Sequence, residues 1–267
     1  MPLTPPRHNA DMLGLLVIGS EILNARRRDS HLPHVTQWAA SRGIRLTWAG
    51  FHDDHLPRLA RAMVGALAAG HPVFTCGGIG ATPDDPTRQA VALAAGVPLE
   101  PHPEAARLIV ERYGDRAYPD RIGMALWPRG SVLIPNPVNG IAAFEFANLF
   151  CLPGFPTMAW PMMDWVAQNR LNLPEETEWQ RALVLHGVGE GDLIPLLSRM
   201  EQGYPQLALS CLPGVTETDP VAELSLRGRP ATLVESAFQD LQNGLRAMGA
   251  TRWEICDQND SRQKLTG

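Results

Sequence analysis

Strand-like and helix-like apolar patterns alternate in the N-terminal part of the chain. Apolar runs at residues 12–18 and 73–76, with the segment 45–51 between them, predict buried strands. Apolar residues three and four positions apart predict amphipathic helices in the connections. We expect one helix to begin after Asp29 or Ser30, and the next three to cover residues 56–69, 89–95 and 104–113.

The alternation continues with strands at residues 131–134 and 144–152, followed by a helix that extends through Trp165. Strands that alternate with helices predict a three-layer α/β/α fold around a mostly parallel sheet. Ligands bind to such sheets beyond the carboxyl ends of the strands. The loops that follow the strands are therefore the first place to look for a site.

The pattern changes near residue 169. The order of the elements that follow is βαββαβ, which is typical of a small ferredoxin-like α+β domain. These elements are predicted at residues 182–186, 191–200, 206–211, 221–226, 231–248 and 252–256. We therefore predict two domains, residues 1–168 and 169–267.

Composition narrows the possible functions. The chain has 267 residues, 45% apolar residues and a net charge of -5, which fits a globular protein that does not bind nucleic acid. No apolar stretch predicts a membrane span, and no secretory signal is evident, so we expect a cytoplasmic protein. Lys264 is the only lysine among the 23 basic residues, which excludes a Walker-type phosphate lysine in the body of the chain.

The most informative segment is a glycine-rich turn within residues 75–87, between a predicted strand and a predicted helix. Its glycines are Gly77, Gly78 and Gly80, and two carboxylates follow at Asp84 and Asp85. Glycines allow a ligand to approach the main chain, and free N–H groups at the start of a helix favour anions. Two carboxylates beside a phosphate require a bridging cation, so the segment indicates metal-assisted phosphate binding.

A purely structural interpretation of the same segment stays open. Thr82 as N-cap, Pro83 at the first helical position and Asp85 three residues after the cap would form an ordinary helix start. On this interpretation the helix begins at Pro83, and the two carboxylates only stabilise the helix through its dipole.

Two other loops are predicted at the same edge of the sheet. Gly19, Ser20 and Glu21 follow the first strand, and Glu21 could join Asp84 and Asp85 as a ligand of Mg²⁺ or another divalent cation. Glu21 could instead act as a general base or cap the next helix. A second loop carries Asn136 and Gly140, which we expect to line the site.

The order of these motifs resembles the MoaB/Mog-type molybdopterin-binding domain in its CinA-like branch. The resemblance rests on residues 18–23, 29–30, 53–54, 77–87, 136–137 and 152–156. The C-terminal βαββαβ segment also resembles the middle domain of CinA-like proteins, including residues 189–193. The amidase domain of full-length CinA proteins is not expected here, so nicotinamide-nucleotide deamidation is not assigned.

The resemblance implies a three-layer α/β/α fold, a divalent ion and a phosphate-bearing ligand over the glycine turn. The implied ligand is a nucleotide or molybdopterin, and relatives often form homo-oligomers. Beside Glu21, Asp84 and Asp85, the candidate binding residues are Gly19, Ser20, Gly77, Gly78, Ile79, Gly80, Thr82, Asn136, Gly140, Pro153 and Gly154.

Two activities are associated with such domains. CinA-like and FAD-hydrolase-like relatives cleave the pyrophosphate of ADP-ribose or FAD, and this metal-dependent hydrolysis is our preferred hypothesis. Mog-like relatives bind molybdopterin, so a non-catalytic binding module or a role in molybdenum cofactor assembly is the alternative. A degenerate domain kept for oligomerisation is a third possibility. Ser20 stands where many relatives have an acidic residue, and Ala81 where many have proline.

Overall fold

The computed structural model describes residues 7–174, 178–215 and 220–256, and it divides the chain into two compact units, residues 1–175 and 176–267. The boundary predicted at residue 169 falls inside a helix of the first unit, α6 (Pro156–Arg170). After this helix, β10 (Leu171–Asn172) pairs with β1 (His8–Asn9). The first unit therefore retains the residues assigned to the start of the second domain.

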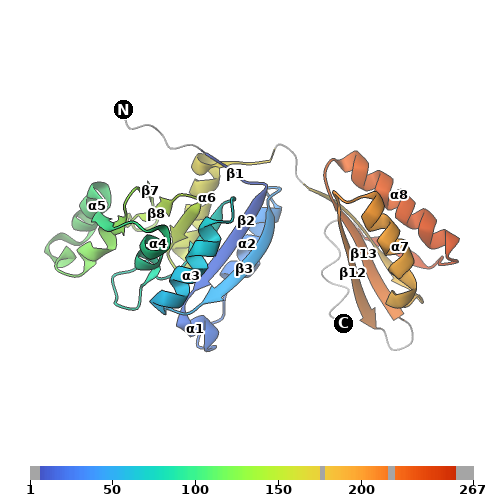
Figure 1. The fold of residues 1–267 in the computed structure, drawn as a ribbon, viewed down its shortest axis with the longest axis horizontal. Coiled ribbons are helices and arrows are strands. Elements are labelled where there is room, and N and C mark those ends of the chain that lie inside the picture. Colours follow the sequence, from blue (N-terminus) through green and yellow to red (C-terminus); the bar gives the residue numbers. More distant parts are fainter. Residues whose placement is uncertain (1–6, 175–177, 216–219, 257–267) are drawn as a thin grey trace. The chain divides into compact units, whose positions relative to one another are not determined.

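A six-stranded sheet forms the centre of the first unit, in the order β3-β2-β4-β9-β8-β7 (Figure 1). The first four strands are parallel to one another, and β8 and β7 continue the sheet in antiparallel pairing. The strands are β2 (Met12–Ile18), β3 (Arg45–His52), β4 (Val73–Cys76), β7 (Val132–Ile134), β8 (Ala143–Phe146) and β9 (Leu149–Leu152).

Helices cover both faces of this sheet, which confirms the predicted three-layer fold. The α-helices of the unit are α1 (Ser20–Leu23), α2 (His31–Ala40), α3 (Leu56–Leu67), α4 (Thr87–Ala95), α5 (Pro103–Tyr113) and α6. The short hairpin β5 (Leu99–Pro101) and β6 (Leu126–Pro128) and the 3₁₀ helices η1 (Gly114–Ala117) and η2 (Arg121–Ala125) complete it.

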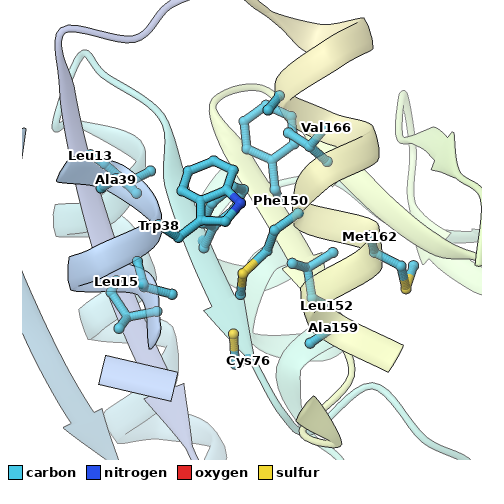
Figure 2. Packing of buried hydrophobic residues seen from close by; sticks show 14 of the residues in the cluster. Leu13, Leu15, Trp38, Ala39, Cys76, Phe150, Leu152, Ala159, Met162 and Val166 are labelled. Carbon is cyan, nitrogen blue, oxygen red and sulfur yellow. The ribbon is translucent and has the colours of Figure 1, made fainter. Parts of the chain in front are cut away.

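The alternation of side chains along β2 divides the core into two clusters. Leu13, Leu15 and Val17 pack with residues of α2 and α6, whereas Leu16 and Ile18 pack with residues of α3, α4 and α5. Successive residues of a strand point to opposite faces, so a continuous apolar run serves both helical layers. In Figure 2, Trp38 and Ala39 of α2 and Val166 of α6 lie over the same face of the sheet.

One predicted strand is two strands. The segment 144–152 forms a hairpin of β8 and β9 instead of a single strand, because the chain turns at Ala147, where φ is 51°. Asn148 anchors this turn: its side-chain amide donates to the carbonyls of Ala66 (2.9 Å) and His71 (2.8 Å). The turn residues are Ala147 and Asn148, so the sequence lacks the glycine that usually marks a tight hairpin.

The second unit has the predicted βαββαβ order. Its sheet is antiparallel, in the order β12-β13-β11-β14, and its two helices contribute to one core cluster. The elements are β11 (Trp179–His186), α7 (Glu190–Gly203), β12 (Ala208–Val215), β13 (Pro220–Gly228), α8 (Ala231–Ala247) and β14 (Trp253–Cys256). This is the strand order of a ferredoxin-like domain. In the described part of the chain, no helix combines the length and apolarity needed to cross a membrane.

Candidate functional site

The glycine turn leaves the carboxyl end of β4 in a conformation that excludes side chains. Gly77 has φ 117° and Gly78 has φ 67°. A Cβ on Gly77 would lie 2.1 Å from the carbonyl oxygen of Ile18, and a Cβ on Gly78 would lie 2.4 Å from Thr87 Oγ1. These glycines are therefore required both by backbone angle and by close approach.

The helix after the turn begins later than the capped-helix interpretation predicts. α4 starts at Thr87 instead of Pro83, since Asp85 precedes Pro86 and is disfavoured in the helical region. Thr82 and Asp85 close a separate turn: Asp85 N donates to Thr82 O (3.0 Å), and Thr82 N donates to Asp85 Oδ2 (3.0 Å). The interpretation of residues 82–85 as a helix N-terminus is wrong.

Four consecutive backbone N–H groups of this turn are unpaired. Within the chain as described, the N–H groups of residues 78–81 have no hydrogen-bond acceptor, whereas Gly77 N donates to Leu152 O (3.0 Å) and Thr87 N donates to Gly78 O (2.9 Å). Successive free N–H groups in a turn form a typical anion-binding concavity.

A cavity of about 450 Å³ is lined in part by these four residues. Its lining combines the glycine turn with apolar side chains from distant segments. The lining residues are Gly78, Ile79, Gly80, Ala81, Thr82, Asp85, Tyr113, Met124, Asn136, Asn139, Ile141, Ala142, Pro153, Gly154, Phe155 and Met158. Seven of the predicted binding residues, from Gly78 to Gly154, thus share one cavity with Asp85, and the volume is that of a small-molecule site.

Asn136 is the polar residue in this cavity with spare hydrogen-bonding capacity. Its side chain is buried, and its Oδ1 accepts from Val138 N (3.0 Å), while its Nδ2 has no partner among the residues described. Gly140 lies outside the lining: it has φ 79°, and its N–H donates to Asn136 O (3.1 Å). An unpaired buried amide donor is costly, so Asn136 fits a ligand acceptor.

The first motif forms a different hollow. Ser20 N donates to Asp54 Oδ2 (2.8 Å) and Asp54 N donates to Ser20 Oγ (3.2 Å), so Ser20 joins two loops. The Glu21 carboxylate folds back over Gly19, whose Cβ would lie 2.6 Å from Glu21 Oε2. Glu21 lines a hollow of only about 20 Å³ together with Asp29 and others, outside the lining of the glycine-turn cavity.

The three carboxylates do not make a preformed metal centre. The residues described contain no group of three or more His, Cys, Asp or Glu side chains that could hold a metal ion. Asp84 is exposed and outside the cavity lining, and Glu21 lines the separate hollow. Asp85 alone lines the cavity, and one carboxylate suffices for a Mg²⁺ ion whose other ligands are phosphate oxygens and water.

Arg88 is a site-supporting residue that the sequence analysis did not identify. It is 5% exposed, and its Nη2 donates to Gly80 O (2.7 Å) while its Nη1 donates to Gly123 O. Burial lowers the pKa of its guanidinium, and the nearby Asp85 carboxylate acts in the opposite direction. A single arginine at the start of a helix that carries no other charged residue is the signal that could have revealed it.

His31 supports the loop behind the turn. Its Nε2 is 3.1 Å from Gly154 O, and burial lowers the pKa of the imidazole, which favours the neutral form with Nε2 as donor. Ser30 is the N-cap residue of α2, and the capping contacts come from Asp29, whose carboxylate accepts from His31 N (2.9 Å) and Leu32 N (3.0 Å). Gly154 packs closely on Gly77, which joins the loop that carries Pro153 to the glycine turn.

The comparison with known families agrees with this geometry. A family model described as a probable molybdopterin binding domain matches residues 14–173, which include every strand of the central sheet except part of β2. The chain belongs to this family. The resemblance predicted from the order of its motifs is confirmed.

The known proteins that are similar to this chain include CinA-like proteins. A CinA-like protein of Citrifermentans bemidjiense is 31% identical over 210 residues, which cover 75% of this chain and 50% of the relative. The chain thus spans about half the length of that protein. A protein of Aeropyrum pernix is 26% identical over 260 residues, which cover 89% of this chain and 94% of the relative.

A solved structure supports the same family membership. The crystal structure of the protein CinA from Thermoplasma acidophilum, described as having unknown function, matches with a TM-score of 0.56 and 25% identity. The match covers 60% of this chain and 98% of that chain. Together with the family match, it identifies the chain as a CinA-like member of the MoaB/Mog type.

Proposed function

We propose that this chain binds a phosphate-bearing small molecule with a planar heterocycle, a nucleotide or molybdopterin, in the glycine-turn cavity. The observation that carries the proposal is that residues 78–81 have unpaired N–H groups and that all four residues line the cavity. Backbone donors of this kind bind phosphate oxygens without a lysine. Membership of a family described as a probable molybdopterin binding domain supports the same class of ligand.

The rest of the cavity suits the organic part of such a ligand. Its walls carry the apolar side chains of Ile79, Met124, Ile141, Phe155 and Met158. A flat ring gains stability from burial against apolar and aromatic groups, and a few polar groups fix its orientation. The spare Nδ2 donor of Asn136 supplies one such group for a ring or ribose acceptor.

The reaction in this proposal is hydrolysis of the pyrophosphate in an ADP-ribose- or FAD-type substrate. A water oxygen bonds to one phosphorus and gives up its protons to the solvent, the bond from that phosphorus to the bridging oxygen breaks, and the bridging oxygen leaves with the other phosphate. A divalent cation, when bound, withdraws charge from the phosphate oxygens. Asp85 would hold that cation, and the N–H groups of residues 78–81 would stabilise charge on the non-bridging oxygens.

Binding of molybdopterin without hydrolysis is the second candidate. Two observations favour it: the carboxylates at Glu21, Asp84 and Asp85 are not gathered into one cluster, and Ser20 holds a loop instead of offering a carboxylate. On this alternative the same cavity binds the pterin and its phosphate, and the chain serves in assembly of the molybdenum cofactor.

Replacing Asp85 separates the two candidates. We expect Asp85→Asn to reduce pyrophosphate hydrolysis by about 100-fold, because the amide keeps an acceptor for Thr82 N but loses the charge that holds the cation. Asp84→Asn is the matched control and should change the rate less than about 3-fold, since Asp84 is exposed and outside the cavity lining.

The measurement is product formation from ADP-ribose, FAD and NAD with Mg²⁺ or Mn²⁺, with both variants assayed beside the unmodified protein. Turnover that is equal in Asp85→Asn and Asp84→Asn would reject the role of Asp85. A protein that binds pterin or nucleotide in calorimetry, but releases no product from any substrate, would reject hydrolysis and favour the binding module.

A further inference from the structure

We propose that Arg88 is a positioning residue whose buried charge makes the glycine-turn cavity select anionic over neutral ligands. The inference rests on the proposed function, because it assumes that a phosphate group occupies the turn. It adds a residue that touches no ligand in this geometry and that lies behind the lining of the cavity.

The contacts of Arg88 place its charge directly under the turn. Its Nη2 donates to Gly80 O (2.7 Å), and Gly80 belongs to the segment whose N–H groups are unpaired. Its Nη1 donates to the carbonyl of Gly123 in η2, next to Met124 of the opposite cavity wall. The Arg88 side chain therefore connects the glycine turn, which would bind the phosphate, to the segment around Met124, which would contact the ring.

This cation has no ion-pair partner in the part of the chain that the structure describes. Among the described residues, no carboxylate lies within 4.0 Å of its guanidinium, although Asp85 is close enough to act toward a higher pKa. Asp85 is itself occupied, because its Oδ2 accepts from Thr82 N (3.0 Å) and from Thr82 Oγ1. A charge that is 95% buried without a paired carboxylate is destabilising until an anion arrives.

An anionic ligand would complete this arrangement. A phosphate over residues 78–81 lies on the far side of the Gly80 peptide from the guanidinium, so the field of Arg88 adds to that of the N–H groups. Charges interact more strongly in a buried, poorly solvated place than in water. The same field contributes nothing to the binding of an uncharged nucleoside of the same shape.

The variants that test this role are Arg88→Met, which keeps the length and removes the charge, and Arg88→Lys, which keeps the charge and loses the planar fork. Replacing a buried charge by an apolar side chain of similar size often preserves stability. Arg88→Gln is a second neutral variant if Arg88→Met fails to fold. Arg61→Gln is the matched control, since Arg61 is an exposed arginine on α3.

Calorimetry gives dissociation constants for AMP, adenosine and inorganic pyrophosphate with each variant. We expect Arg88→Met to weaken AMP and pyrophosphate binding at least about 10-fold and adenosine binding less than about 3-fold. Arg88→Lys should recover most of the loss, and Arg61→Gln should match the unmodified protein. A structural role alone would weaken AMP and adenosine equally.

Equal weakening of AMP and adenosine, or unchanged AMP binding in both neutral variants, would overturn the inference and leave the proposed function intact. If the unmodified protein binds neither AMP, pyrophosphate nor pterin phosphate, the proposed function fails, and the inference fails with it. Unmodified protein that binds adenosine as tightly as AMP also overturns the inference, because the phosphate group of AMP then adds nothing to the affinity.

Discussion

Gly77→Ala is expected to lower the free energy of unfolding by about 3 kcal/mol or more. The φ of Gly77 is 117°, an angle that residues with a side chain rarely adopt. The new Cβ would lie 2.1 Å from the carbonyl oxygen of Ile18. That oxygen belongs to the backbone of the central strand β2, so it has little freedom to move aside. The variant must displace β2 or the turn, and we expect ligand binding to be lost as well.

The matched control is Gly65→Ala on α3. No atom lies within 4 Å of the position that its Cβ would take, and the residue is exposed within a helix. Alanine has the higher helix propensity, so stability should rise by about 0.5–1 kcal/mol. Urea unfolding followed by tryptophan fluorescence measures both variants. Similar stability for the two would show that Gly77 does not have the close contacts described.

Glu145→Ala is expected to lower the free energy of unfolding by about 3–5 kcal/mol, since it removes the carboxylate from a buried ion pair with Arg170. Glu145 and Arg170 are 4% and 3% exposed as whole residues, and Arg170 Nη2 donates to Glu145 Oε1 over 2.6 Å. His8 Nε2 lies 3.0 Å from the same oxygen. The pair ties β8 to the end of α6, close to the boundary of the first unit.

Glu104→Ala provides the comparison for an exposed pair. Glu104 contacts Arg107 over 2.6 Å, but both side chains are about half exposed, so its replacement should lower the stability far less than Glu145→Ala does. The double variant Glu145→Leu with Arg170→Met should recover most of the stability lost in Glu145→Ala. Chemical unfolding of the three variants checks the order. A Glu145→Ala protein as stable as Glu104→Ala would contradict the account of the buried pair.

Much of the fold follows from the sequence because strong apolar patterns reflect burial on both faces of the sheet. The run at Met12–Ile18 and the run at Val73–Cys76 form strands with those bounds. The hairpin at Ala147 was missed because its turn depends on Asn148 side-chain bonds to residues about 80 positions away. The predicted boundary at residue 169 lies inside α6, which continues to Arg170, and the chain divides into its two units a few residues later.

The candidate site was predicted in part, for reasons of the same kind. Glycines indicate a backbone that adopts unusual angles or lies close to another group, so the turn itself could be predicted from the sequence. Its partners were not: Tyr113 and Met124 come from segments without a pattern that points to a ligand, and only the fold brings them to the cavity. The sequence also could not distinguish Asp85 from Asp84, because the two are adjacent after the same turn. Only the fold brings Asp85, and not Asp84, into the cavity lining.

A crystal structure of the chain with a bound nucleotide or pterin phosphate tests the central claim most directly. The account predicts phosphate oxygens within hydrogen-bond distance of the N–H groups of residues 78–81, and the ring among Met124, Ile141 and Met158. It also predicts that Asn136 Nδ2 gains an acceptor. A ligand bound elsewhere on the protein, with the N–H groups of residues 78–81 facing only water, would contradict it.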